Sequence, residues 1–276
     1  LKRTNTIQEI TAVDESKFSI NYQQQLNSSQ YEAVSATEGN FLVIAGAGSG
    51  KTRTLVYRVA RLTELGNDPS SILLLTFTRK AAKEMMNRAA LLLDNRCSKI
   101  NGGTFHSFAN TVLRKYAKAV NLDNGFTILD QGDSEDVINL IRGQLNLSQH
   151  KKRFPNKQTI FKVISLSVNT GRSIESILEE DYPHFVEYTD KFLDIEKIYV
   201  SYKRQNSLLD YDDLLVFLKM FLESKNSASQ TFISGIKYIM VDEYQDTNKL
   251  QSDIILALGQ SRQNIMVVGD DSQSIY

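Results

Sequence analysis

Four short apolar runs stand out along the chain, and each has the length and composition of a buried β-strand. They cover residues 41–45, 72–76, 238–241 and 264–268. Nearly continuous apolar runs of this length are typical of strands buried on both faces of a parallel sheet. The pattern therefore predicts an α/β fold whose sheet is built from two separate parts of the chain.

Amphipathic helical patterns follow the first two apolar runs. Residues 51–65 place Leu55, Val59 and Leu62 on one face, and Gly66 is a natural end for that helix. Residues 79–93 are rich in Ala, Met and Leu, which favour a second helix. Strand–helix alternation of this kind predicts parallel strands joined by crossover helices.

The middle of the chain has a different pattern. Between about residues 111 and 206 only helical patterns appear, for example over 134–145 and 185–205. With three prolines in the whole chain, helices can run long. We therefore expect three parts: an N-terminal extension over 1–25, a sheet domain from 26–112 and 206–276, and an inserted all-helical subdomain over 113–205.

Composition narrows the class of protein. The chain has 276 residues, 41% of them hydrophobic, with 32 Lys and Arg against 32 Asp and Glu. A wholly disordered chain is excluded, and net charge gives no support for nucleic-acid binding. The single cysteine, Cys97, excludes an internal disulfide, and no apolar run approaches the ~20 residues of a membrane span. We expect a soluble, cytoplasmic protein with no membrane partner. Because the sequence starts at Leu1 and stops at Tyr276, soon after a predicted strand, we also expect a fragment of a longer protein.

A glycine-rich segment joins the first predicted strand to the first predicted helix. Its residues are Ala45, Gly46, Ala47, Gly48, Ser49, Gly50, Lys51 and Thr52. Glycines let several backbone N–H groups turn toward phosphate oxygens, where the helix adds its positive end. Lys51 can reach the β- and γ-phosphates, and the Thr52 hydroxyl can coordinate magnesium. The alternative is a plain glycine-rich turn, but the flanking strand and helix favour a phosphate site, although Ala45 stands where the generic motif has glycine.

A pair of carboxylates follows the third predicted strand. Asp242 and Glu243 come directly after the apolar run 238–241, so they belong at the carboxyl edge of the sheet, where ligands bind. Asp242 would hold the magnesium ion, and Glu243 would orient and deprotonate an attacking water. Such a pair alone is more often a solvated turn. Together with the glycine-rich loop it predicts hydrolysis of a nucleoside triphosphate.

Several further motifs, in their order along the chain, resemble superfamily 1 DNA helicases of the UvrD/PcrA/Rep family. Motif I covers 46–53, and Ala45 before it matches the alanine with which the motif commonly starts in this family. Motif II covers 242–248. The remaining resemblances lie at 26–30 (Q motif), 76–82 (motif Ia), 103–109 (motif Ib), 211–215 (the return from the insertion) and 268–276 (motif III). Ser272 departs from the family, which often has Asp at that place.

The resemblance implies a RecA-like P-loop NTPase fold that binds ATP and Mg²⁺. Gln30 would read adenine, Arg53 would complete the nucleotide site, and Gln273 would sense the γ-phosphate. Single-stranded DNA and single-strand/duplex junctions are the implied partners, contacted through aromatic residues: Phe77, His106 and Tyr276. Base stacking on such rings is tolerant of sequence. The alternative for each aromatic residue is packing in the protein core, which is more common for a single aromatic side chain than binding DNA.

The implied activity is ATP-dependent 3′-to-5′ DNA unwinding. A second RecA-like domain, with its arginines, is not in this sequence, so we expect slow ATP hydrolysis and no unwinding by the chain alone. Three alternatives stay open: a helicase–nuclease subunit of the recombination type, a non-motor module that uses ATP to gate DNA binding, and, least favoured, a P-loop small-molecule kinase.

The predicted insertion offers one further candidate site. Six basic residues fall in a stretch without Asp or Glu: Lys151, Lys152, Arg153, Lys157, Lys162 and Arg172. Such a run is usually a solvated face. The alternative is a surface that contacts duplex phosphates.

Overall fold

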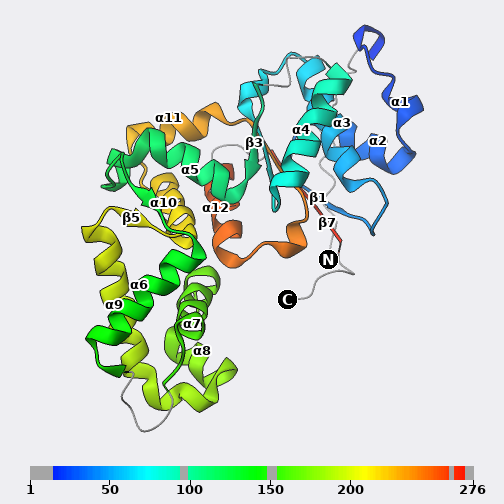
Figure 1. Cartoon of the computed structure of the whole chain (residues 1–276). Helices are drawn as coiled ribbons and strands as arrows, with labels where there is room; N and C mark the ends of the chain where they lie inside the picture. Colours follow the sequence, from blue (N-terminus) through cyan, green and yellow to red (C-terminus); the bar gives the residue numbers. More distant parts are fainter. Residues whose placement is uncertain (1–14, 94–98, 148–153, 261–263, 271–276) are drawn as a thin grey trace.

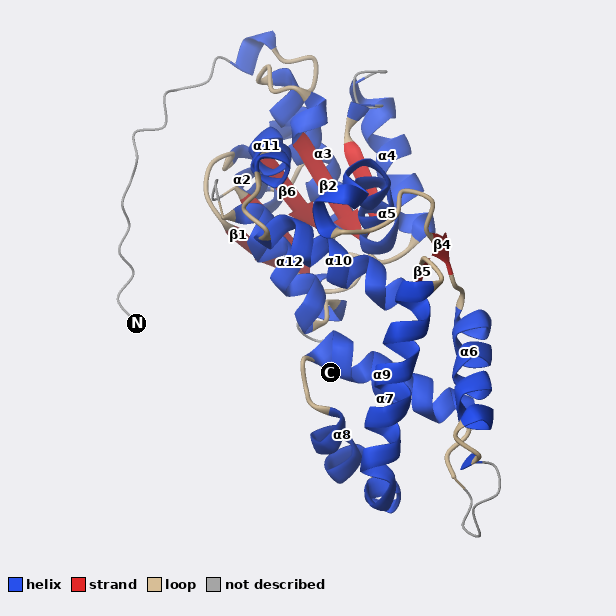
Figure 2. Ribbon diagram, turned by 90° about the vertical axis from the view of Figure 1, so that its left-hand side faces the viewer, coloured by secondary structure: helices blue, strands red, loops and turns tan. Residues whose placement is uncertain are grey.

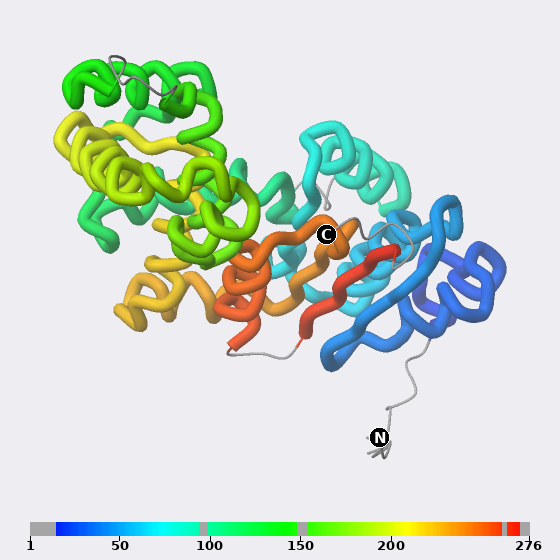
Figure 3. Tube along the Cα trace, turned by 90° about the horizontal axis from the view of Figure 1, so that it is seen from below, coloured from blue at the N-terminus to red at the C-terminus, as the bar shows by residue number. Residues whose placement is uncertain are grey.

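A five-stranded parallel sheet forms the centre of the molecule. The computed structural model describes residues 15–93, 99–147, 154–260 and 264–270, and Figure 1 shows the whole chain. The strands lie in the order β1 (Phe41–Ile44), β7 (Ile265–Gly269), β6 (Tyr238–Val241), β2 (Ile72–Thr76) and β3 (Asn101–Thr104). Every neighbouring pair is parallel. Figure 3 shows β1 and β7, drawn blue and red, side by side although they come from opposite ends of the chain.

The two edge strands depart from the predicted pattern. The sequence pattern missed β3, whose Asn-Gly-Gly-Thr sequence has no apolar run. Strand β1 is not buried on both faces, because Leu42 and Ile44 are 62% and 61% exposed. An edge strand has a neighbour on one side only, so its burial depends on what covers it, which a local pattern cannot reveal.

Helices cover both faces of the sheet. The central strands alternate: Leu74 and Met240 join one apolar cluster, and Leu75 and Val241 join the other. On the first face lie α1 (Tyr22–Gln25), α2 (Ser28–Ser35), α3 (Lys51–Glu64) and α4 (Arg79–Leu93). On the second lie α5 (Phe105–Tyr116), α10 (Tyr211–Glu223), α11 (Ser227–Gly235) and α12 (Lys249–Gly259). Within the described residues, no helix is long and apolar enough to cross a bilayer.

The described part of the predicted N-terminal extension packs against the sheet domain. Helix α1 and the preceding 3₁₀ turn, Glu15–Lys17, lie against α3. The Tyr22 ring is buried, and its hydroxyl donates to Glu64 Oε2 at 2.6 Å. Arg61 of α3 pairs with Glu15. Residues 15–25 therefore share the core of the domain, which their polar sequence did not indicate.

The insertion forms a second, mainly helical body (Figure 2). Its helices are α6 (Gln131–Gln144), α7 (Lys157–Thr170), α8 (Ile174–Asp181) and α9 (Thr189–Gln205), and a 3₁₀ helix covers Pro183–Tyr188. They enclose a separate apolar core. The prediction of an all-helical insertion needs one correction. A two-residue strand, β4 (Thr127–Ile128), pairs in parallel with β5 (Leu208–Leu209), and a strand that short leaves no pattern in the sequence.

Candidate functional site

The glycine-rich loop connects β1 to α3 at the carboxyl edge of the sheet. Its first residue is fixed by the Ala45 N–H, which donates to the Gly269 carbonyl at 3.0 Å. Gly50 is the N-cap of α3 with φ +87°, and a Cβ there would lie 2.7 Å from Gln30 Nε2. An L side chain is therefore strained by the backbone conformation, and it would also displace the Gln30 amide. The loop ends at the N-terminus of a fourteen-residue helix, where free N–H groups favour an anion.

Lys51 lies under this loop and is 8% exposed. Its ammonium donates to the Ala45 carbonyl at 3.0 Å and the Gly46 carbonyl at 3.4 Å. It also lies 3.7 Å from a carboxylate oxygen of Asp270, which follows β7. Asp270 directly follows β7, as Asp242 directly follows β6. The sequence pattern assigned no role to Asp270, although its position after a predicted strand could have indicated one.

The loop and the carboxylate pair meet at one point. The Thr52 hydroxyl donates to Asp242 Oδ2 at 3.0 Å. Burial raises the pKa of Asp242, the bond from Thr52 lowers it, and the nearby Glu243 raises it. Hydroxyl and carboxylate oxygens are the ligands that magnesium prefers. The described residues hold no cluster of three His, Cys, Asp or Glu side chains suited to a metal. Two protein oxygens with phosphate and water ligands fit the usual pattern for Mg²⁺.

Glu243 has an unusual backbone conformation beside this pair. Its φ is +52°, in the left-handed region, and its N–H donates to Asp242 Oδ1 at 3.1 Å. Its carboxylate accepts a bond from Gln245 Nε2 at 2.8 Å. Non-glycine residues in this region cluster at functional sites, where the surrounding contacts hold them.

Gln30 and Arg53 lie on the other side of the loop. Asn27 caps α2, and its backbone N–H donates to Gln30 Oε1 at 3.3 Å. Gln30 Nε2 donates to the Ser49 carbonyl at 2.9 Å, and Arg53 donates to the Gln25 carbonyl at 2.7 Å. Both predicted nucleotide-binding side chains therefore border the loop. Gln273 lies outside the described residues.

Two of the predicted DNA-binding residues follow neighbouring strands. Phe77 comes after β2, and His106 lies at the start of α5, directly after β3 and Phe105. The Phe77 and Phe105 rings are 5.9 Å apart, and the His106 ring meets Tyr211 edge-on at 5.8 Å. Burial lowers the pKa of His106, and the nearby Asp212 raises it. Tyr276 lies outside the described residues.

Tyr211 is an aromatic residue that the sequence reasoning did not assign to this surface. It begins α10 and is 43% exposed, which is unusual for so large a ring. Its position beside His106 depends on the return of the chain from the insertion.

The structure describes three of the six basic residues in the predicted stretch, and two of these three form ion pairs. Lys157 forms an ion pair with Asp136, and Arg172 pairs with both Glu180 and Asp181. Lys162 is exposed. Lys151, Lys152 and Arg153 lie outside the described residues. The paired carboxylates lie outside the stretch, so the absence of acids within it did not reveal the ion pairs of Lys157 and Arg172.

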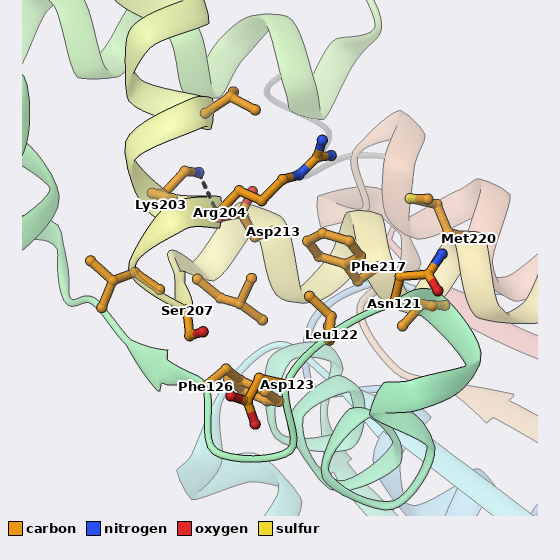
Figure 4. A pocket seen from close by; sticks show the side chains of 14 residues that line it. Asn121, Leu122, Asp123, Phe126, Lys203, Arg204, Ser207, Asp213, Phe217 and Met220 are labelled. Atoms are coloured by element: carbon orange, nitrogen blue, oxygen red, sulfur yellow. Dashed lines mark ion pairs between the residues drawn. The ribbon is translucent and has the colours of Figure 1, made fainter.

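A cavity of about 530 Å³ lies away from the glycine-rich loop, where the insertion joins the sheet domain (Figure 4). Phe126, Phe217 and Met220 line it together with the Lys203–Asp213 ion pair. Among the predicted site residues that the structure describes, none lines this cavity.

Comparison with known proteins shows the family of the chain. Residues 26–276 match the model of the UvrD/REP helicase N-terminal domain. An ATP-dependent DNA helicase PcrA of Staphylococcus epidermidis is 37% identical over 257 residues, 92% of this chain and 34% of that protein. A protein of the same name from Staphylococcus aureus is 35% identical over 255 residues, 91% of this chain and 34% of its own length. The chain thus spans about a third of these relatives. It belongs to the UvrD/Rep helicase family and corresponds to the N-terminal domain of that family.

Proposed function

We propose that this chain is the ATP-binding N-terminal portion of an ATP-dependent DNA helicase that moves 3′-to-5′ on single-stranded DNA and opens duplex at junctions. The observation that carries the proposal is the contact between Thr52 and Asp242 at 3.0 Å. It joins a phosphate-binding loop to a strand-end carboxylate, as a RecA-like NTPase requires. The polarity rests on the family resemblance, and the relatives are named ATP-dependent DNA helicases.

In this proposal the chain's own residues divide the work on ATP. The loop N–H groups and Lys51 bind the phosphates, and Gln30 and Arg53 contact the base. Thr52 and Asp242 hold Mg²⁺, which supplies charge neutralisation on the phosphate oxygens. Glu243 orients the attacking water and accepts its proton.

Three aromatic residues, Phe77, His106 and Tyr211, form the proposed DNA-binding surface. They lie at or near the sheet edge that carries the nucleotide loop. A DNA strand bound to them would therefore respond to movement of that loop. Ring stacking contributes about 1–3 kcal/mol per base. We also propose a cytoplasmic location, since the single cysteine argues against a disulfide-stapled secreted protein.

The test uses the full-length protein. ATP hydrolysis is measured with and without single-stranded DNA for the wild type, for Glu243→Gln, and for Glu179→Gln, an exposed carboxylate of α8, as the control. We expect DNA-stimulated turnover that Glu243→Gln lowers by about 10²–10⁴-fold and Glu179→Gln leaves unchanged. Duplexes with 3′ or 5′ single-stranded tails test polarity.

Two results would count against the proposal. A wild-type protein without ATPase activity contradicts it outright. Unchanged turnover in Glu243→Gln would instead favour the non-motor, ATP-gated module. The 276-residue chain should turn over at least about 10³-fold more slowly than the full-length protein, because the arginines of a second domain are not supplied.

A further inference from the structure

The side-chain amide of Gln245 joins the ends of two strands in the nucleotide site. Gln245 belongs to the single 3₁₀ turn Tyr244–Asp246 that follows β6. Its Nε2 donates to Glu243 Oε2 at 2.8 Å, and its Oε1 accepts the Asp270 N–H at 3.0 Å. A Cβ at Gly269 would lie 2.9 Å from this Oε1, so glycine there leaves room for the amide.

We propose that Gln245 is a positioning residue: it fixes the Glu243 carboxylate relative to the phosphate loop. The inference rests on the function proposed above and extends it to a residue with no assigned role. A carboxylate that activates water must be held in one orientation, and a neighbouring amide does so at low cost. Gln245 needs both ends of its amide, one to donate and one to accept.

The Gln245 amide is also connected to Lys51, through Asp270. Asp270, whose backbone Gln245 holds, lies with a carboxylate oxygen 3.7 Å from the Lys51 ammonium. Both groups are buried, Asp270 at 2% exposure. Gln245 therefore sets the position of Glu243 directly and of the carboxylate beside Lys51 through the backbone. This connects the end of β6 to the end of β7.

Two variants separate the two bonds. Gln245→Glu keeps an oxygen to accept the Asp270 N–H but replaces the donor to Glu243 with a second negative charge. Gln245→Met has similar length and loses both bonds. Gln230→Glu, on the exposed side of α11, is the matched control for added charge.

In the full-length protein we expect both Gln245 variants to lower kcat for DNA-stimulated ATP hydrolysis by about 10–100-fold, with KM for ATP changed less than about threefold. Added to Glu243→Gln, either variant should lower kcat by less than about twofold further, because the group it positions is already gone. The control should match the wild type.

A structural readout in the 276-residue chain is independent of activity. Exchange of the Asp270 amide hydrogen should quicken in Gln245→Met and stay slow in Gln245→Glu, at unchanged unfolding midpoints. Unchanged kcat in both Gln245 variants of an active enzyme, full additivity with Glu243→Gln, or an Asp270 amide indifferent to Gln245→Met would each overturn the inference. A wild type without ATPase activity would instead overturn the proposed function and leave the exchange measurement to decide the Gln245–Asp270 contact.

Discussion

Thr52 and Asp242 are 190 residues apart in the chain, yet the hydroxyl of the first donates to the carboxylate of the second at 3.0 Å. Their strands, β1 and β6, are not neighbours, because β7 lies between them. Both residues follow the carboxyl ends of parallel strands, and such ends share one edge of the sheet. The strand order therefore brings Thr52 and Asp242 together, and their side chains are long enough to meet across the end of β7.

Removing the Thr52 hydroxyl should weaken magnesium-dependent nucleotide binding. Thr52→Val keeps the shape of the side chain and deletes its bond to Asp242, and bonds to charged groups contribute about 1.5–3 kcal/mol. We expect affinity for a fluorescent ADP to fall about tenfold or more with Mg²⁺ and little without it. Thr52→Ser, which keeps the hydroxyl, is the control. An equal loss with and without Mg²⁺ would contradict the assignment of Thr52 to the metal.

Adding a methyl group at Gly50 should destabilise the fold. Gly50→Ala forces an L residue to φ +87° and brings its Cβ to 2.7 Å from Gln30 Nε2. The expected loss in the free energy of unfolding is about 1–2 kcal/mol, measured by urea denaturation. Gly143→Ala should have the opposite effect. Gly143 lies in α6 with open space around its Cα, so alanine there should increase the free energy of unfolding by about 0.5–1 kcal/mol. Equal effects at both positions would refute the backbone argument.

His106→Ala should weaken binding of single-stranded DNA without changing its salt dependence. Burial lowers the pKa of His106, so at neutral pH the ring is uncharged and contributes by stacking rather than by charge. We expect roughly 5–100-fold weaker binding in a fluorescence anisotropy titration. His184→Ala, on the exposed 3₁₀ helix of the insertion, should have no effect. A flatter salt slope for His106→Ala would mean that a cation had been lost.

Asp213 should make the fold more stable as pH falls. Burial and the neighbouring Asp210 raise its pKa to about 6, although Lys203 lies 2.5 Å away, because two carboxylates share one ammonium. The folded state therefore binds more protons than the unfolded state between about pH 4 and pH 6. The contribution of Asp213 to the free energy of unfolding therefore increases as pH falls through about 6 and decreases as pH rises through it.

The measurement is urea unfolding from about pH 7 to about pH 5. The wild type should gain on the order of 1 kcal/mol from this group, and Asp213→Asn should show a correspondingly flatter pH dependence. Met220→Leu, in the same cavity, removes no titratable group and keeps the wild-type slope. A slope in Asp213→Asn equal to that of the wild type would place the dependence on another group.

The central strands were predictable because strands in the middle of the sheet are buried on both faces and therefore have apolar runs, whatever the strand order. The predicted runs at 72–76 and 238–241 coincide with β2 and β6. Residues 79–93 form α4 as the pattern indicated. The run at 41–45 also coincides with β1, an edge strand, but two other strands were not predictable: β3 carries glycines rather than apolar residues, and β4 has two residues. Their existence depends on a neighbouring strand that is distant in sequence.

The sequence by itself determined which candidate site residues are present. The glycine-rich loop, Lys51, Thr52 and the Asp242–Glu243 pair are local patterns whose residue types predict phosphate and metal binding. Tertiary structure alone decided which of these meet: that β7 brings Asp270 beside Lys51, that Gln245 holds Glu243, and that Tyr211 lies next to His106. The reason is physical. Hydrogen bonds and ring contacts act over a few ångströms, and the order of strands in a sheet, which no local pattern encodes, determines which distant residues come that close.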